Sequence, residues 1–207
     1  MVPARNLVAK PAGLSFEQAA CLPTAWLTAY RMLFTQAAVR PGDRVLVQGA
    51  GGGVSTAAIA LGRAAGLTVW VTGRDEAKRS RALELGAHEV FEPGARLPAR
   101  VDAVLETVGK ATWSHSMKSL RPGGTLGVSG ATTGADPSAD LNRLFFLQLR
   151  VLGSTMGTRD ELEAMLRLMA GTGVRQQVDE VVPLSEAQRG FERLVAGDVV
   201  GKVVLTA

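Results

Sequence analysis

Short apolar runs rich in β-branched residues alternate with longer amphipathic stretches from residue 44 to residue 170. The runs predict strands, and the stretches between them predict helices. The expected strands are residues 44–48, 68–72, 89–91, 103–106, 125–129 and 151–154, and the expected crossover helices are residues 54–65, 75–85, 112–119, 141–149 and 159–169. This alternation predicts an α/β fold with a doubly wound, six-stranded parallel Rossmann sheet.

The two ends of the chain follow a different pattern. Residues 1–13 contain Pro3 and Pro11 and predict an extended segment, and residues 15–36 predict a helix broken near Pro23. At the other end, residues 178–182, 186–196 and 202–205 predict a strand, a helix and a strand. These elements have no place in a six-stranded sheet, so we expect them to belong to a second domain.

The most informative stretch is the glycine-rich segment that joins the first expected strand to its helix. Gly49 and Gly51 satisfy the first half of the pattern G-x-G-x-x-G, but its last position is Val54; Gly49, Gly52 and Ser55 fit G-x-x-G-x-x-S instead. Glycines let a pyrophosphate approach backbone N–H groups at the positive end of a helix dipole. The alternative is a tight turn with no ligand. The chain has no Walker A signature, which argues against an NTPase.

The second expected strand should end at the group that recognises the adenosine ribose. An acidic side chain there would favour NAD(H) and repel a 2′-phosphate, but this chain has Gly73 followed by Arg74, and Lys78 one helical turn later. A guanidinium and an ammonium at these positions suit a phosphate. We therefore expect NADP(H) rather than NAD(H), the alternative being that both cations are solvated and pair with acidic neighbours.

Composition and charge remove several classes of protein. The 207 residues are 46% hydrophobic, 20% charged and 5% aromatic, which is typical of a globular protein. We expect neither a membrane span nor a secretory signal, and hence a cytoplasmic protein. The net charge is +4 and the basic residues are scattered, so nucleic acid is not an expected partner. A single cysteine and two histidines cannot supply a zinc site from nitrogen and sulfur donors alone.

A resemblance to a known family adds to this interpretation. In chain order, the motifs are ACLPTAWLTAY from Ala20, the loop from Gly49 to Ser55, LGA from Leu85, ETVG from Glu106, RPGG from Arg121 and GKVVL from Gly201. Together they resemble the medium-chain dehydrogenase/reductase superfamily, in its quinone oxidoreductase and zinc-type alcohol dehydrogenase-like branch.

The resemblance implies a Rossmann domain with strand order 3-2-1-4-5-6 and a separate GroES-like catalytic domain. It implies that residues 1–14 and 173–207 are parts of that catalytic domain, and that residues 15–172 form the NAD(P)-binding domain. Most of the substrate pocket and the zinc ligands would lie in a portion that this chain lacks. The resemblance also implies a small-molecule substrate and, as an expectation, a homodimer formed through the edge of the sixth strand.

Family positions carry over to residues expected near the cofactor, whereas the catalytic residues stay unknown. The cofactor-binding candidates are Thr28, Gly49, Gly52, Gly53, Val54, Arg74, Lys78, Thr107, Val108, Gly109, Gly130, Ala131 and Lys202. Two positions depart from family patterns: Thr24 occupies the place of a zinc-binding cysteine, and Pro93 the place of a tyrosine that packs on the cofactor. We therefore expect no zinc in this chain.

The expected function is an NADPH-dependent oxidoreductase that delivers hydride to a carbonyl or an activated alkene, with this chain as mainly its dinucleotide-binding portion and weakly active alone. Three alternatives stay open. They are a non-catalytic NADPH-binding module, the enoyl-reductase portion of a multienzyme chain, and a methyltransferase that uses S-adenosylmethionine. The last is disfavoured because such enzymes prefer an acidic residue where this chain has Gly73 and Arg74. No G-x-S-x-G motif supports a serine hydrolase, and Cys21, between apolar neighbours, is expected to be buried rather than nucleophilic.

Overall fold

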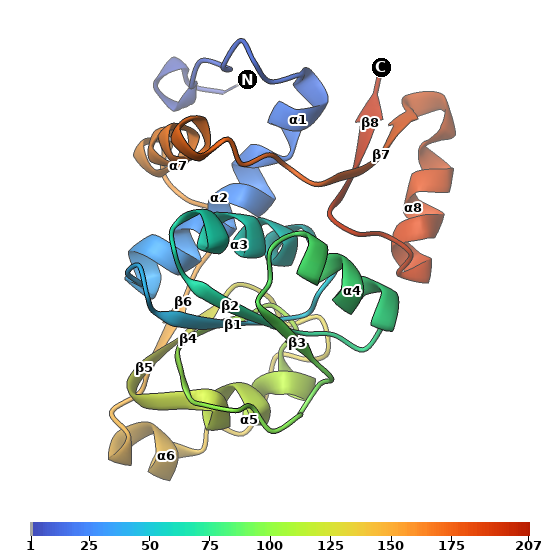
Figure 1. Ribbon diagram of the computed structural model, residues 1–207. Helices are drawn as coiled ribbons and strands as arrows, with labels where there is room; N and C mark the ends of the chain where they lie inside the picture. The colour runs from blue at the N-terminus through green and yellow to red at the C-terminus, as the bar shows by residue number, and fades with distance from the viewer. Residues whose placement is uncertain (1) are drawn as a thin grey trace.

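The computed structural model describes residues 2–207 and contains a six-stranded, wholly parallel sheet (Figure 1). Its strands are β1 (Arg44–Gln48), β2 (Thr68–Thr72), β3 (Glu89–Phe91), β4 (Val101–Glu106), β5 (Leu120–Val128) and β6 (Arg150–Gly153). The strand order is β3-β2-β1-β4-β5-β6, which confirms the predicted doubly wound topology. The order reverses between β1 and β4, and ligands of such sheets bind at this switch point, outside the carboxyl ends of the strands.

Both faces of the sheet are covered by helices, and the pleat of each strand sends alternate side chains into two cores. Val45 and Val47 of β1 point into one core, whereas Leu46 between them points into the other. The first core lies under the N-terminal helical run, α3 (Gly53–Ala64) and α7 (Arg159–Thr172), and α5 (Lys110–Ser119) and α6 (Leu141–Phe146) cover the opposite face (Figure 1). Burial on both faces explains the continuous apolar runs seen in the sequence.

Helix ends follow the capping signals of the sequence. The side chain of Asp75 accepts a hydrogen bond from the backbone N–H of Lys78 at the start of α4 (Glu76–Glu84). Thr158 and Glu161 form a capping box at the start of α7, and Gly173, in the left-handed conformation, ends that helix. The predicted helices agree with these bounds within about three residues.

The N-terminal region differs in part from expectation. After a 3-10 turn at Ala4–Asn6, the chain is helical almost continuously from α1 (Phe16–Ala20) through a π-helical segment (Leu22–Trp26), α2 (Leu27–Tyr30) and a second π-helical segment (Arg31–Gln36). The predicted break near Pro23 is confirmed: α1 ends at Ala20, Cys21 is a turn residue, and Pro23 lies in the first turn of the π-helical segment that follows, where a missing N–H removes no helical bond. Within residues 2–207, none of the helices combines the length and apolar character that crossing a bilayer requires.

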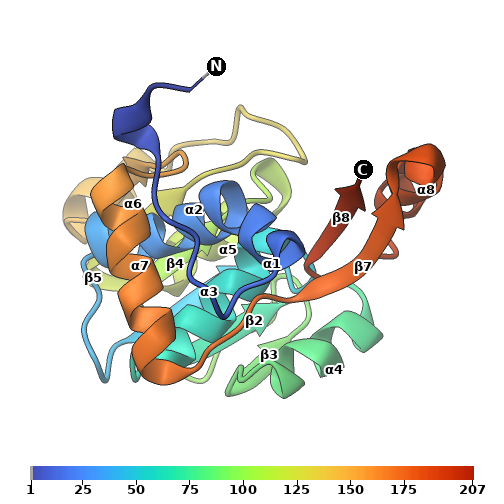
Figure 2. The same ribbon diagram turned by 90° about the horizontal axis from the view of Figure 1, so that it is seen from above.

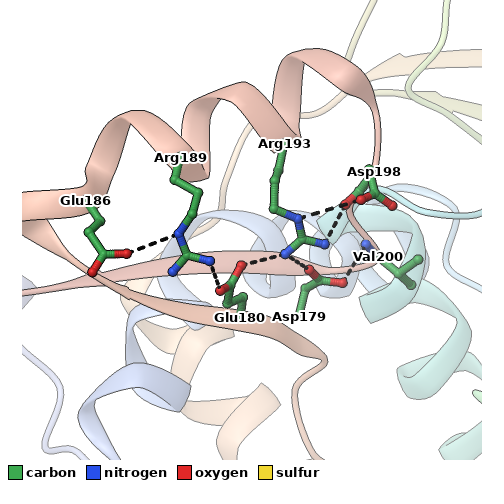
Figure 3. A network of polar contacts seen from close by, with 7 residues as sticks. All are labelled: Asp179, Glu180, Glu186, Arg189, Arg193, Asp198 and Val200. Carbon is green, nitrogen blue, oxygen red and sulfur yellow. Dashed lines mark hydrogen bonds and ion pairs between the residues drawn. The ribbon is translucent and has the colours of Figure 1, made fainter.

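The C-terminal residues form a small separate unit, which lies beside the main sheet (Figure 2). β7 (Val178–Pro183) pairs in parallel with β8 (Lys202–Thr206), and α8 (Ala187–Ala196) connects them after a 3-10 turn at Leu184–Glu186. Two arginines hold α8 to β7: Arg189 pairs with Glu180, and Arg193 pairs with Asp179 and Glu180 (Figure 3). The unit is thus joined by ion pairs as well as by strand pairing.

Candidate functional site

The glycine-rich loop after β1 lies at the switch point of the sheet. Gly49 has a φ of +90°, and a Cβ there would lie 3.5 Å from Cγ2 of Val108 after β4. Gly52 is the N-cap of α3 and offers no capping side chain. Because the first N–H groups of a helix lack helical partners, the start of α3 at Gly53 and Val54 presents free donors and the positive end of a twelve-residue helix to this crevice.

The C-terminal unit packs directly on this loop. The backbone N–H of Gly201 donates to the carbonyl of Gly51 at 2.9 Å. A Cβ at Gly53 would lie 2.7 Å from Cδ of Lys202 and 3.2 Å from Cβ of Ala25. The stem of Lys202 therefore crosses the first residue of α3, as expected for a residue that borders the cofactor cleft, and only glycine fits beneath it without a shift.

The tip of β2 gathers three basic side chains. Arg74 is exposed, and Arg79, which the sequence analysis did not single out, donates to the carbonyls of Gly73 at 2.7 Å and Arg74 at 3.0 Å. A Cβ at Gly73 would lie 2.8 Å from Cβ of Ala50 and 3.2 Å from Cγ of Arg79. The acidic side chain that would bind the ribose of NAD has no room here unless the loop or Arg79 moves.

Lys78 is placed differently from the sequence expectation. Its Nζ donates to the carbonyl of Gly197 in the C-terminal unit, and its Cδ would lie 2.7 Å from a Cβ at Gly51. The amine thus lies beside the glycine-rich loop, in a bond that joins α4 to the end of α8. The ammonium has three donors, so it keeps further N–H groups that a phosphate could accept from while the bond to Gly197 holds.

The turns that follow β4 and β5 interlock at the same edge of the sheet. Gly109 has a φ of +93°, and a Cβ there would lie 2.6 Å from the carbonyl oxygen of Gly134 and 2.8 Å from Cα of Ala131. A Cβ at Gly130 would lie 2.7 Å from the carbonyl oxygen of Thr107. Two turns far apart in the sequence thus meet backbone to backbone, which brings the candidates after β4 beside those after β5.

A buried polar network lies beneath this edge, and the sequence analysis did not find it. Glu106, the last residue of β4, is fully buried, and so is Gln48, the last residue of β1. Gln48 donates to Oγ of Ser116 at 2.9 Å and lies 3.0 Å from Nδ1 of His115. His115 is partly buried, and its Nε2 lies 2.9 Å from the carbonyl of Ala95. A neutral ring with the proton on Nε2 satisfies both contacts.

The helical run before β1 closes one side of the crevice. Ala25 packs near Gly53, and Thr28, the nicotinamide-side candidate, is buried in α2, which packs against α3. Cys21 is buried as expected. Burial raises the pKa of its thiol, and the charge of Lys202 opposes that rise. A buried thiol of raised pKa lacks thiolate character, which agrees with a structural cysteine.

These features fit a dinucleotide. The glycine-rich loop gives backbone access to a pyrophosphate, and the basic tip of β2 lies where a sheet of this topology binds adenosine. Within residues 2–207, no group of three or more histidine, cysteine, aspartate or glutamate side chains is arranged to hold a metal ion. No step of the chemistry proposed below passes through a metal.

Comparison with known proteins agrees with this geometry. Residues 53–171, more than half of the chain, match the family described as zinc-binding dehydrogenase. A zinc-type alcohol dehydrogenase-like protein of Schizosaccharomyces pombe is 30% identical over 222 residues, which cover 99% of this chain and 64% of that protein.

Solved structures extend the likeness to the fold. An NAD-dependent alcohol dehydrogenase is 35% identical with a TM-score of 0.90, covering 100% of this chain and 63% of its own. A 2-octenoyl-CoA carboxylase reductase in complex with NADP and 2-octenoyl-CoA is 28% identical with a TM-score of 0.90, covering 97% of this chain and 52% of its own. The chain thus spans from about half to just under two thirds of these relatives. It belongs to the zinc-binding dehydrogenase family, within the medium-chain dehydrogenase/reductase superfamily, and corresponds to its C-terminal, dinucleotide-binding portion.

Proposed function

We propose that this chain is the dinucleotide-binding portion of an NADPH-dependent oxidoreductase that reduces a carbonyl or an activated alkene. The observation that carries the proposal is the pairing of a glycine-rich loop at a helix N-terminus with a basic β2 tip where a side chain at Gly73 would clash with Ala50 and Arg79. Relatives described as NAD-dependent and as bound to NADP both exist, so the preference for NADPH rests on this tip.

Each part of the crevice has a distinct role in this proposal. The free N–H groups at Gly53 and Val54 receive the pyrophosphate, and Arg74 faces the 2′-phosphate, to which a guanidinium can donate two parallel hydrogen bonds. The turns at Gly109 and Gly130 shape the half of the crevice that belongs to β4–β6, where the second mononucleotide of such a sheet binds. The bound cofactor would supply the hydride, and the protein would orient it and exclude water.

A titration tests the cofactor assignment. NADPH and NADH would each be titrated by calorimetry into the wild type, into Arg74→Ala and into Arg40→Ala. Arg40→Ala is the control, because it also removes one positive charge but lies before the N-terminal end of β1, away from the glycine-rich loop. We expect NADPH to bind the wild type more tightly than NADH. Arg74→Ala should weaken NADPH binding by roughly tenfold or more, the cost of losing a charged hydrogen bond, and leave NADH binding unchanged. Equal affinity for both dinucleotides, or an equal effect of both arginine variants, would contradict the assignment.

We also propose that residues 1–14 and 173–207 belong to a second, GroES-like domain, and residues 15–172 to the Rossmann domain. The observation in support is that β7 and β8 form a sheet of their own, which at two strands is marginal alone. Apolar side chains of this unit are also exposed, namely Leu184, Phe191, Leu194 and Val195. On this proposal the chain binds NADPH but reduces enone and aldehyde substrates weakly; turnover at the rate of intact relatives would contradict it.

We also propose that two copies of the chain form a homodimer through the β6 edge of the main sheet. β6 is the edge strand, and apolar side chains on it and on α6 are exposed, namely Leu141, Phe145, Phe146 and Val151. Exposed apolar patches of this kind mark association sites. In a sedimentation experiment the wild type should be a dimer, and Val151→Lys, which places a charge on β6, should be a monomer. A monomeric wild type would refute this arrangement.

A further inference from the structure

The carboxylate of Glu106 is the centre of the buried network at the end of β4. The residue is fully buried, and its Oε1 accepts from the backbone N–H groups of Val108 at 2.8 Å and Gly109 at 3.0 Å. The hydroxyl of Thr112 donates to both carboxylate oxygens, at 2.8 and 2.9 Å, and that of Ser116 donates to Oε2 at 2.6 Å. All four partners donate, so both oxygens are satisfied without a cation.

Two of these donors belong to the turn that lies in the crevice. The N–H groups of Val108 and Gly109 point inward to Glu106, so the carbonyl of Val108 points the other way, where it accepts from the backbone N–H of Thr133 at 2.8 Å. Glu106 therefore sets the orientation of two successive peptide groups. Only in this orientation can the carbonyl of Val108 accept from the loop after β5.

One of the other two donors, Ser116, ties the carboxylate to the first half of the sheet. Ser116, which donates to Glu106, accepts from Gln48 at the end of β1, and Gln48 in turn accepts from the hydroxyl of Thr72 at the end of β2. The network thus links the tips of β4, β1 and β2 through α5. It crosses the switch point of the sheet beneath the glycine-rich loop.

We infer that Glu106 is a positioning residue for the nicotinamide half of the dinucleotide. This inference rests on the proposed function and deepens it. Glu106 lies under the turn at Thr107, Val108 and Gly109 without reaching the crevice itself, since its side chain is enclosed. Glu106 fixes the shape of the cofactor site on the side of β4 to β6, whereas β2 and the glycine-rich loop shape the side that receives adenosine.

The isosteric change Glu106→Gln tests this role. An NH₂ group in the place of Oε2 would face the hydroxyls of Thr112 and Ser116, which donate to that oxygen in the wild type. Both hydroxyls would have to turn their protons away and accept instead, so the network would lose an acceptor that it uses twice. We expect NADPH to bind Glu106→Gln roughly tenfold to a hundredfold more weakly, the range for losing a hydrogen bond to a charged group. The adenosine half should be unaffected.

Two probes separate positioning from general damage. Calorimetry would compare NADPH with 2′,5′-ADP, which carries only the adenosine half, in the wild type, Glu106→Gln and the milder Ser116→Ala. Ser119→Ala is the matched control, because Ser119 lies on the same helix, is also buried, and donates to the carbonyl of His115 instead of Glu106. We expect both network variants to lose NADPH affinity, Ser116→Ala less, while 2′,5′-ADP affinity and the control stay at wild-type values.

The outcomes distinguish the two proposals. Equal losses of NADPH and 2′,5′-ADP affinity in Ser116→Ala, or unchanged NADPH affinity in both network variants, would overturn the role of Glu106 while leaving the proposed function intact. A wild type that binds neither probe would overturn the proposed function, and the inference with it. Should Glu106→Gln fail to fold, the comparison of Ser116→Ala with Ser119→Ala decides alone.

Discussion

Gly109 gives the sharpest stability prediction, because its backbone and its surroundings both exclude a side chain. Its φ and ψ of 93° and −133° lie in a region that only glycine enters readily. Gly109→Ala would force that conformation on an L-residue. It would also place a methyl group 2.6 Å from the carbonyl oxygen of Gly134 and 2.8 Å from Cα of Ala131, which are backbone atoms that no rotamer change can move.

The cost follows from these two terms. A non-glycine residue in a forbidden region costs about 1–3 kcal/mol, and overpacking a tight site costs about another 1–3 kcal/mol. The smaller entropy of the unfolded alanine chain offsets about 0.4–1 kcal/mol of this. We therefore expect the free energy of unfolding to fall by about 1–5.5 kcal/mol, against the roughly 5–15 kcal/mol that a domain has in total.

Urea unfolding followed by circular dichroism measures this change. Gly171→Ala is the matched control, because Gly171 lies in α7 with no atom within 4 Å of an added Cβ. An alanine there should raise the free energy of unfolding by about 0.5–1 kcal/mol. A Gly109→Ala protein within about 0.5 kcal/mol of the wild type would show that the turn after β4 yields easily, and the reasoning on the interlocked turns would fail.

Three further predictions concern the helices that surround the sheet. Burial raises the pKa of Glu161, but hydrogen bonds from Thr35, from the backbone of Thr158 and from Arg31 lower the pKa overall. The Glu161 carboxylate should therefore stabilise the folded state fully above pH about 5, and this stabilisation should be lost as the pH falls through the lowered pKa. Urea unfolding across pH should show Glu161→Gln differing from the wild type only above this range. Thr158→Ala removes the N-cap of α7 and should cost about 0.5–2 kcal/mol in the same assay at neutral pH; an unchanged midpoint would contradict the cap. Arg193→Ala removes its ion pairs with Asp179 and Glu180 and leaves the pair between Arg189 and Glu180 (Figure 3), so hydrogen exchange should speed up in α8 and not in α3.

The sequence predicted the sheet well because buried parallel strands have a plain signature. β1, β2 and β3 have the predicted bounds; β1 and β2 are each followed directly by a glycine, and β3 by Glu92. β4 begins two residues earlier than expected, at Val101, because Asp102 interrupts the apolar run although its carboxylate accepts from the backbone N–H of Arg44. Asp102 fits in the strand because its carboxylate bonds to the neighbouring strand β1, a contact that the sequence alone does not show.

The residues that the sequence missed at the site act through partners far along the chain. Gln48 and Glu106 are parts of the sequence motifs, but nothing in either motif indicates that Ser116 hydrogen-bonds to both of them. Arg79 is an ordinary helix residue in sequence, and its contact with the carbonyl of Gly73 depends on how α4 leaves β2. Polar residues at strand ends that lack a local partner are the signal that could have led to this network.

Lys78 shows why a motif position does not by itself define a role. Its amine bonds to Gly197, and the same C-terminal segment donates from Gly201 to the carbonyl of Gly51. The phosphate side of the crevice is therefore held partly by residues more than a hundred positions later in the chain. Lys78→Met would remove the bond to Gly197 together with any phosphate contact of the amine, so it would alter both cofactor contact and the docking of the C-terminal unit. Arg74 is exposed and outside this link, and its replacement therefore reports on 2′-phosphate recognition alone.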